Sequence, residues 1–178
     1  MGIPSYFSNI IRRYPGIIQK YNPSLIINQL FMDCNSIIYD SFHNISKDND
    51  TKSQLHIEEK IIKEVIKKIN TYIKTIGGKK LNYLAFDGVA PIAKMEQQKT
   101  RRFKSNYEKK LNENQSIEWD TSSITPGTIF MKKLERELKK TYNNVNNIII
   151  DFSAPGEGEH KIFDYIRENS ILTGNTII

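Results

Sequence analysis

Four carboxylates in three separated segments have the clearest potential for chemistry. Asp33 and Asp87 end short apolar runs, and Glu157 and Glu159 flank Gly158 in a turn of small residues. Acidic groups gathered beside buried strands are unfavourable unless a cation compensates them. Oxygen ligands favour Mg²⁺ or Mn²⁺, and paired ions of this kind hydrolyse phosphodiester bonds by activating water and stabilising the leaving oxygen. We therefore predict a catalytic Mg²⁺ or Mn²⁺ site formed by these four side chains.

Ordinary structural roles could also explain these acids. The two glutamates stand at a helix start, where the helix dipole favours anions, and Asp87 could cap the helix that follows Pro91. Asn35, on the same strand face as Asp33, could support the metal ligands or could be a turn residue. No histidine or cysteine pairing competes as a nucleophile, and Cys34 is expected to be a small core residue. Both interpretations of the acids stay open from the pattern alone.

A second set of polar side chains follows Asp87 directly. Lys94, Gln98, Arg101 and Arg102 are separated by four, three and one residues, which places them on one face of a helix. Most charged stripes are solvated faces. Adjacent arginines with an amide and a lysine nevertheless suit phosphate recognition. The position of this stripe, a turn or two beyond Asp87, predicts a pocket for a terminal phosphate beside the metal site.

The surrounding elements predict an α/β protein with a mostly parallel sheet flanked by helices. Apolar runs predict strands at 29–34, 81–87 and 147–152, and helical spacing predicts helices at 55–76, 91–111, 126–140 and 159–169, with Thr125 as a cap. Polar stretches at 43–54 and 112–123 are expected to be loops. Ligands of open α/β sheets bind beyond the carboxyl ends of the strands, which is where the acids fall.

Composition narrows the class of protein. The chain has 178 residues, enough for about one domain, and a formal net charge of +6, which permits a polyanionic partner. Its single cysteine excludes a disulfide scaffold and a cysteine cluster for zinc. No apolar run is long enough to span a membrane, and the N-terminus does not have the layout of a signal peptide. We expect an intracellular protein of the cytoplasm or nucleus, with no membrane partner.

Five ordered motifs together resemble the Xrn-type 5′→3′ exoribonucleases. They lie at residues 1–4, 31–39, 84–103, 124–128 and 155–161, and so extend over almost the whole chain. The resemblance implies a PIN/5′-nuclease-like, Rossmann-like sheet, with residues 1–178 as the N-terminal part of the nuclease domain. It also implies divalent-metal hydrolysis of RNA bearing a 5′ monophosphate.

The resemblance assigns roles to particular positions. Asp33, Asp87, Glu157 and Glu159 correspond to metal ligands, and Lys94, Gln98, Arg101 and Arg102 to the 5′-phosphate pocket. The family commonly has a histidine, stacked on the terminal base, at the position of Tyr39. Tyrosine can also stack on a base, so we expect Tyr39 to take that role.

The chain departs from the family near its C-terminus. A strand with an Asp-x-Asp pair follows the Gly-Glu-Gly-Glu helix in the family, and this sequence ends about where that strand begins. We therefore expect an incomplete sheet and site, completed by a C-terminal segment or a second chain, and weak or no activity from the polypeptide alone. Two alternatives remain, a flap-endonuclease-like structure-specific nuclease and a non-catalytic module that binds 5′-phosphorylated RNA.

Overall fold

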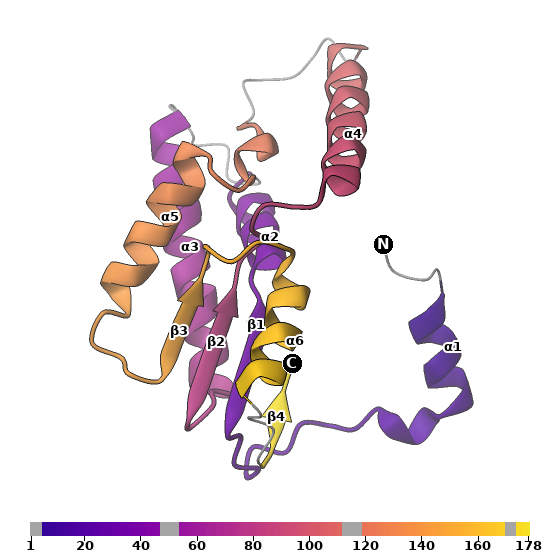
Figure 1. Ribbon diagram of the computed structural model, residues 1–178, viewed down its shortest axis with the longest axis vertical. Coiled ribbons are helices and arrows are strands. Elements are labelled where there is room, and N and C mark those ends of the chain that lie inside the picture. Colours follow the sequence, from indigo (N-terminus) through magenta and orange to yellow (C-terminus); the bar gives the residue numbers. More distant parts are fainter. Residues whose placement is uncertain (1–4, 47–53, 112–118, 170–173) are drawn as a thin grey trace.

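The computed structural model describes residues 5–46, 54–111, 119–169 and 174–178 (Figure 1). Within these ranges it describes the backbone but not the side chains of residues 46, 54, 55, 101, 105, 106 and 108–111. The first motif, residues 1–4, therefore lies outside the described residues, as does most of the loop predicted at 112–123. Arg101 lies in a described helix, but its side chain is outside the description.

A four-stranded parallel sheet forms the centre of the molecule. The strands are β1 (Gln29–Asp33), β2 (Leu81–Ala85), β3 (Ile148–Asp151) and β4 (Thr176–Ile177), in the order β3-β2-β1-β4. The three predicted strands are confirmed, and so is the α/β class. The sequence did not predict β4, because two residues are too short for a recognisable apolar pattern.

Helices cover both faces of the sheet (Figure 1). The helices α2 (Asn35–Ser46), α3 (Gln54–Thr75) and α5 (Ile129–Thr141) cover one face, and α6 (Gly158–Asn169) covers the other. The helix α4 (Ile92–Leu111) stands beyond the carboxyl ends of the strands, and α1 (Tyr6–Arg13) lies apart from the sheet. Two short 3₁₀ helices, η1 (Pro15–Ile17) and η2 (Thr121–Ser123), complete the described elements.

Alternation along β2 explains how both faces are buried. Leu81, Tyr83 and Ala85 pack towards α6, whereas Leu84 and Phe86 pack into the larger core beneath α2, α3 and α5. Because strand side chains alternate between faces, the odd-numbered positions of β2 all point towards α6. The same alternation determines that Asp87, two residues beyond β2, lies on the α6 face.

Several predicted boundaries need correction. The helix predicted at 126–140 begins at Ile129, and its cap is Thr128, whose Oγ1 accepts from the amide of Met131, rather than Thr125. Asn35 does not continue a strand but begins α2, and that helix extends to Ser46 into the predicted loop at 43–54. In the parts of the chain that the structure describes, no helix is both long and apolar enough to cross a membrane.

Candidate metal and phosphate site

The strand ends bring two predicted acids to the α6 face. Asp33 ends β1 and pairs in register with Ala85, the last residue of β2. Asp87 lies two residues beyond Ala85, on the same side of the sheet as Ala85. Since side chains alternate along a strand, Asp33 and Asp87 share the face that α6 covers. The N-terminus of α6 therefore meets both carboxylates.

Gly158 is the contact point between α6 and these acids. Its amide donates to Oδ1 of Asp87 at 2.9 Å. A Cβ at Gly158 would lie 2.7 Å from Oδ1 of Asp33, so only glycine permits this approach without displacing the carboxylate. The capping role considered for Asp87 thus exists, but the amide it accepts from belongs to α6 rather than to the helix after Pro91.

The negative charges of the other predicted acids act on Asp33. Burial raises the pKa of Asp33 above its ordinary value, the Asn35 amide lowers it, and the negative charges of Asp87, Glu159 and Glu157 raise it further. Three other carboxylates therefore act on one side chain, which leaves an excess of negative charge at this edge of the sheet.

Glu157 differs from the other acids because a cation neutralises it. Its Oε1 lies 2.6 Å from Nζ of Lys94, and this contact lowers the pKa of Glu157 below its ordinary value. One side chain from the predicted metal site is thus joined to one from the predicted phosphate pocket.

A cation could be held at the start of α6. Ligand atoms of Glu157, Glu159 and His160 lie within 4.8 Å of one another. Asp33 and Asp87 are outside this close group but act electrostatically on the same edge. Carboxylate oxygens are the ligands that a hard divalent cation prefers, so the residues present fit Mg²⁺ or Mn²⁺.

One open cavity of about 430 Å³ joins the acidic and basic residues. It receives the four predicted acids and most of the predicted phosphate-binding side chains. The lining residues singled out from the sequence are Asp33, Asp87, Glu157, Glu159, Asn35, Tyr39, Lys94, Gln98 and Arg102. The side chain of Arg101 falls outside the described residues, so its place in the phosphate pocket stays a prediction.

Asn35 and Tyr39 enter the cavity from α2. The Asn35 amide donates to Oδ1 of Asp33, and its own Oδ1 accepts from the amide of Asp87. Asn35 therefore links the two strand-end acids, in keeping with a supporting role. Tyr39 is 41% exposed, and burial together with Asp87 raises its pKa while Arg102 lowers it. A side chain so placed presents an accessible ring between the acids and the basic helix.

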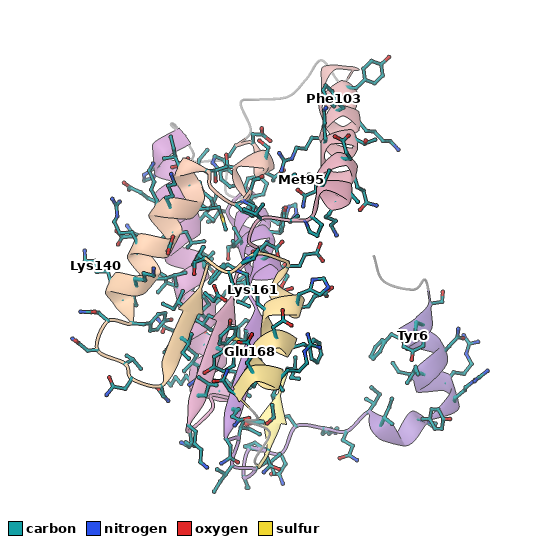
Figure 2. The ribbon with its side chains drawn as sticks, in the orientation of Figure 1. Tyr6, Met95, Phe103, Lys140, Lys161 and Glu168 are labelled. Atoms are coloured by element: carbon teal, nitrogen blue, oxygen red, sulfur yellow. The ribbon has the colours of Figure 1, made fainter. Side chains whose placement is uncertain are left out.

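The sequence did not reveal a buried ion pair behind the acids. Lys161 of α6 (Figure 2) is 3% exposed. Its Nζ lies 3.5 Å from Oδ1 of Asp151, the last residue of β3. Burial lowers the pKa of Lys161. The same factor opposes ionisation of Asp151, but donors including Ala154 N and Tyr83 OH hold its pKa below the ordinary value. The available signal in the sequence was Asp151, an acid near the end of the third predicted strand.

His160 and Thr125 were also missed as site residues. His160 joins the close group with the two glutamates, and its place within the motif at 155–161 was the available signal. Thr125, considered only as a helix cap, lines the cavity and accepts a hydrogen bond from Arg102. Nothing in the spacing of the sequence placed that loop against α4.

Comparison with known families supplies an independent finding. Residues 1–176 match the family described as "XRN 5'-3' exonuclease N-terminus". The match covers all the described strands except the last residue of β4.

Curated relatives carry matching descriptions. The chain is 36% identical to 5'-3' exoribonuclease 1 of Saccharomyces cerevisiae, over 94% of this chain and 12% of that protein. It is 33% identical to 5'-3' exoribonuclease 1 of Homo sapiens, over 94% of this chain and 11% of that protein. For 5'-3' exoribonuclease 2 of Saccharomyces cerevisiae the identity is 30%, over 94% of this chain and 21% of that protein. The chain thus spans between about a tenth and a fifth of these relatives' length.

Proposed function

This chain belongs to the XRN 5′-3′ exonuclease N-terminal family, and from that premise we propose that it is the N-terminal catalytic portion of a 5′→3′ exoribonuclease. The substrate is RNA with a 5′ monophosphate, and the cofactor is Mg²⁺ or Mn²⁺. Residues 1–178 contribute one part of a nuclease domain, and a C-terminal segment or a second chain completes the site.

One observation carries this proposal. The cavity of about 430 Å³ is acidic on the side of the strand ends and basic on the side of α4. Phosphodiester hydrolysis at an RNA terminus needs both properties, because a cation must be held at the scissile phosphate while the terminal phosphate is bound nearby. The ion pair between Lys94 and Glu157 marks the boundary between the two sides.

The acidic residues supply the metal-binding side. Asp33, Asp87, Glu157 and Glu159 would hold the cations. The backbone amide of Asn35 would orient the Asp33 carboxylate, and its side-chain oxygen would hold the backbone at Asp87. A bound divalent cation lowers the pKa of a water ligand and neutralises charge on the phosphate. These side chains also repel an RNA phosphate when no cation is present, so we expect cleavage to depend strictly on metal.

The basic helix supplies the end-recognition side. Lys94, Gln98, Arg101 and Arg102 would bind the 5′ phosphate, since guanidinium groups form paired hydrogen bonds to phosphate oxygens. Tyr39, exposed at the cavity, would stack on the terminal base. The terminal phosphate would thereby set the distance from the chain end to the scissile bond.

Asp87→Asn provides the sharpest test. Asparagine keeps an oxygen that can accept from the Gly158 amide, so the variant retains the fold and loses one negative charge. In a longer protein that contains this chain, release of mononucleotides from 5′-monophosphorylated RNA with Mg²⁺ should fall at least about 100-fold, comparable to the loss of a principal electrostatic contribution to catalysis. Asp164→Asn, which removes an exposed carboxylate of α6, is the matched control and should leave the rate unchanged.

Other outcomes would favour the alternatives. Cleavage unaffected by Asp87→Asn would refute the metal site. Cleavage that requires a DNA flap and ignores the 5′ phosphate would indicate a structure-specific nuclease. Binding of 5′-phosphorylated RNA that is unchanged by EDTA, with no cleavage in a longer protein that contains this chain, would indicate a non-catalytic module.

A further inference from the structure

We propose that Thr125 is a positioning residue that fixes Arg102 towards the 5′ phosphate and thereby sets the preference for phosphorylated RNA ends. This inference rests on the proposed function, because it concerns how the phosphate side of the same cavity is organised. It adds a loop residue, outside the basic helix, to the determinants of specificity.

The hydrogen bonds of Thr125 define its role. Nη2 of Arg102 donates to Oγ1 of Thr125 at 2.6 Å. The same hydroxyl donates to the carbonyl oxygen of Ser122 at 2.6 Å, so the orientation of its proton is determined and its lone pairs face the guanidinium. Arg102 is otherwise exposed, and a long exposed side chain needs such a partner to hold one conformation.

The loop that carries Thr125 is itself held in place. The single hydroxyl proton of Thr128 is shared between the carbonyl oxygens of Ser123 and Thr125, and its Oγ1 also accepts from the amide of Met131 as the cap of α5. Gly127 has φ +86°, a conformation that favours glycine and allows the chain to turn between the two threonines. The Thr125 hydroxyl is therefore fixed relative to the core helix α5 rather than to the exposed helix α4.

Arg102 also lines a second cavity, which its side chain could occupy instead. This cavity of about 280 Å³ is lined by Met95, Gln98, Lys99, Arg102, Phe103 and Thr125. Met95 and Phe103 lie along α4 (Figure 2), and Arg102 and Thr125 line both cavities. The guanidinium thus lies at the boundary between the two cavities. Loss of its bond to Thr125 would let it move to the second cavity, away from a phosphate bound near Lys94.

A conservative pair of variants separates the hydroxyl from the rest of the side chain. Thr125→Val removes the hydroxyl with little change in shape, and Thr125→Ser keeps it. The measurement is fluorescence anisotropy of one RNA sequence with a 5′ phosphate or a 5′ hydroxyl, with EDTA present to prevent cleavage. We expect Thr125→Val to weaken binding of the phosphorylated RNA about fivefold, the effect of losing one hydrogen bond, and of the hydroxyl RNA less than about twofold. Thr125→Ser should resemble wild type.

A double-mutant cycle tests whether Thr125 acts through Arg102. In an Arg102→Ala background, Thr125→Val should cause no further loss of the preference for phosphorylated RNA. Independent losses in the two variants would overturn the inference, as would an equal loss for both RNAs or a Thr125→Ser variant that behaves like Thr125→Val.

Side-chain NMR makes failure of the inference distinguishable from failure of the proposed function. The order parameter of the Arg102 Nε–H group should be high in the free wild type and in Thr125→Ser, and lower in Thr125→Val. An order parameter that does not change would overturn the positioning role even if the RNA preference is observed. A wild-type chain that binds both RNA ends equally would overturn the proposed phosphate site, and this inference with it.

Discussion

The Gly158 amide and the Asp87 carboxylate are joined by a hydrogen bond of 2.9 Å that connects the first turn of α6 to the loop after β2. These residues are 71 positions apart in the chain. The free amides at a helix N-terminus are donors without intrahelical partners, and a carboxylate satisfies them well. The contact therefore holds the helix start, with its two flanking glutamates, against the strand-end acids.

Gly158→Ala should separate metal binding from folding. The added methyl group would lie 2.7 Å from Oδ1 and 2.8 Å from Cγ of Asp33, which must then move. Alanine is otherwise favourable in a helix, so the melting temperature should change by only a few degrees, about the effect of 1 kcal/mol or less. Affinity for Mn²⁺, measured by calorimetry, should fall about tenfold, which corresponds to the misplacement of one ligand.

Gly16→Ala is the matched control for that variant. A Cβ at Gly16 would meet nothing within 4 Å, and the residue lies in η1. This variant should bind Mn²⁺ like wild type. Unchanged affinity in Gly158→Ala would show that Asp33 can move without loss to the metal site, or is not a ligand.

Stability without metal should depend on pH through Asp33. Because the folded pKa is raised above 3.8, the folded chain holds this proton more tightly than the unfolded chain. The stability that the protonated group provides is complete below the unfolded pKa and is lost as pH rises through the folded value. Asp33→Asn should therefore become progressively more stable than wild type as pH rises from about 3.8, and then level off.

Urea unfolding in EDTA across this pH range measures that difference. Asp164→Asn controls for the loss of one exposed charge. Adding Mg²⁺ at neutral pH should stabilise wild type more than Asp33→Asn, because a ligand that binds only the folded state adds to its stability. A difference in stability that does not change with pH would mean that burial and the neighbouring acids do not raise the pKa of Asp33.

Lys94→Ala should weaken RNA binding and change its salt dependence. The variant removes a cation from the cavity and leaves Glu157 without its partner at 2.6 Å. Affinity for 5′-phosphorylated RNA should fall about tenfold at low salt, and the slope of log K against log salt should become shallower by about one. Lys139→Ala breaks a comparable pair with Glu135 on the surface of α5 and should affect neither value. Equal effects of Lys94→Ala and Lys139→Ala on RNA affinity would indicate that the positive charge of the chain attracts RNA without a specific site.

Lys161→Met should be the most destabilising of these changes. The Lys161 side chain is 1% exposed beside Asp151, whereas the side chain of Lys133, which pairs with Glu58, is 30% exposed. Removing one partner of a buried pair leaves an uncompensated charge, but Asp151 keeps other donors, so we expect a loss of about 2–3 kcal/mol in urea unfolding. Lys133→Met should cost about 1 kcal/mol or less. Similar losses of unfolding free energy in Lys161→Met and Lys133→Met would show that burial does not increase the contribution of the Lys161–Asp151 pair.

The strands were predictable because each is a short apolar run, and β1 and β2 begin at the predicted residues. The helix cap was not, because Thr125 and Thr128 are both suitable residues three positions apart. The choice depends on the turn at Gly127, which places Thr128 rather than Thr125 next to the first free amides of α5.

The helix α2 was missed although a signal for it exists. Its sequence is rich in Asn and Ser, which are weak helix formers, and it folds by burying Ile37, Ile38 and Phe42. Together with Cys34 and Ser41 these positions repeat at helical spacing. The acid at the end of β3 pointed to Asp151 alone, because its pairing with Lys161 depends on how α6 packs on the sheet.

The lone thiol of the chain lies directly behind the acidic edge. Cys34 follows Asp33, is 0% exposed, and its pKa is raised by burial and by that neighbouring charge. A thiol in this state reacts only when the surrounding packing opens. The alkylation rate of Cys34 therefore reports, without any engineered label, how often the core packing next to Asp33 opens.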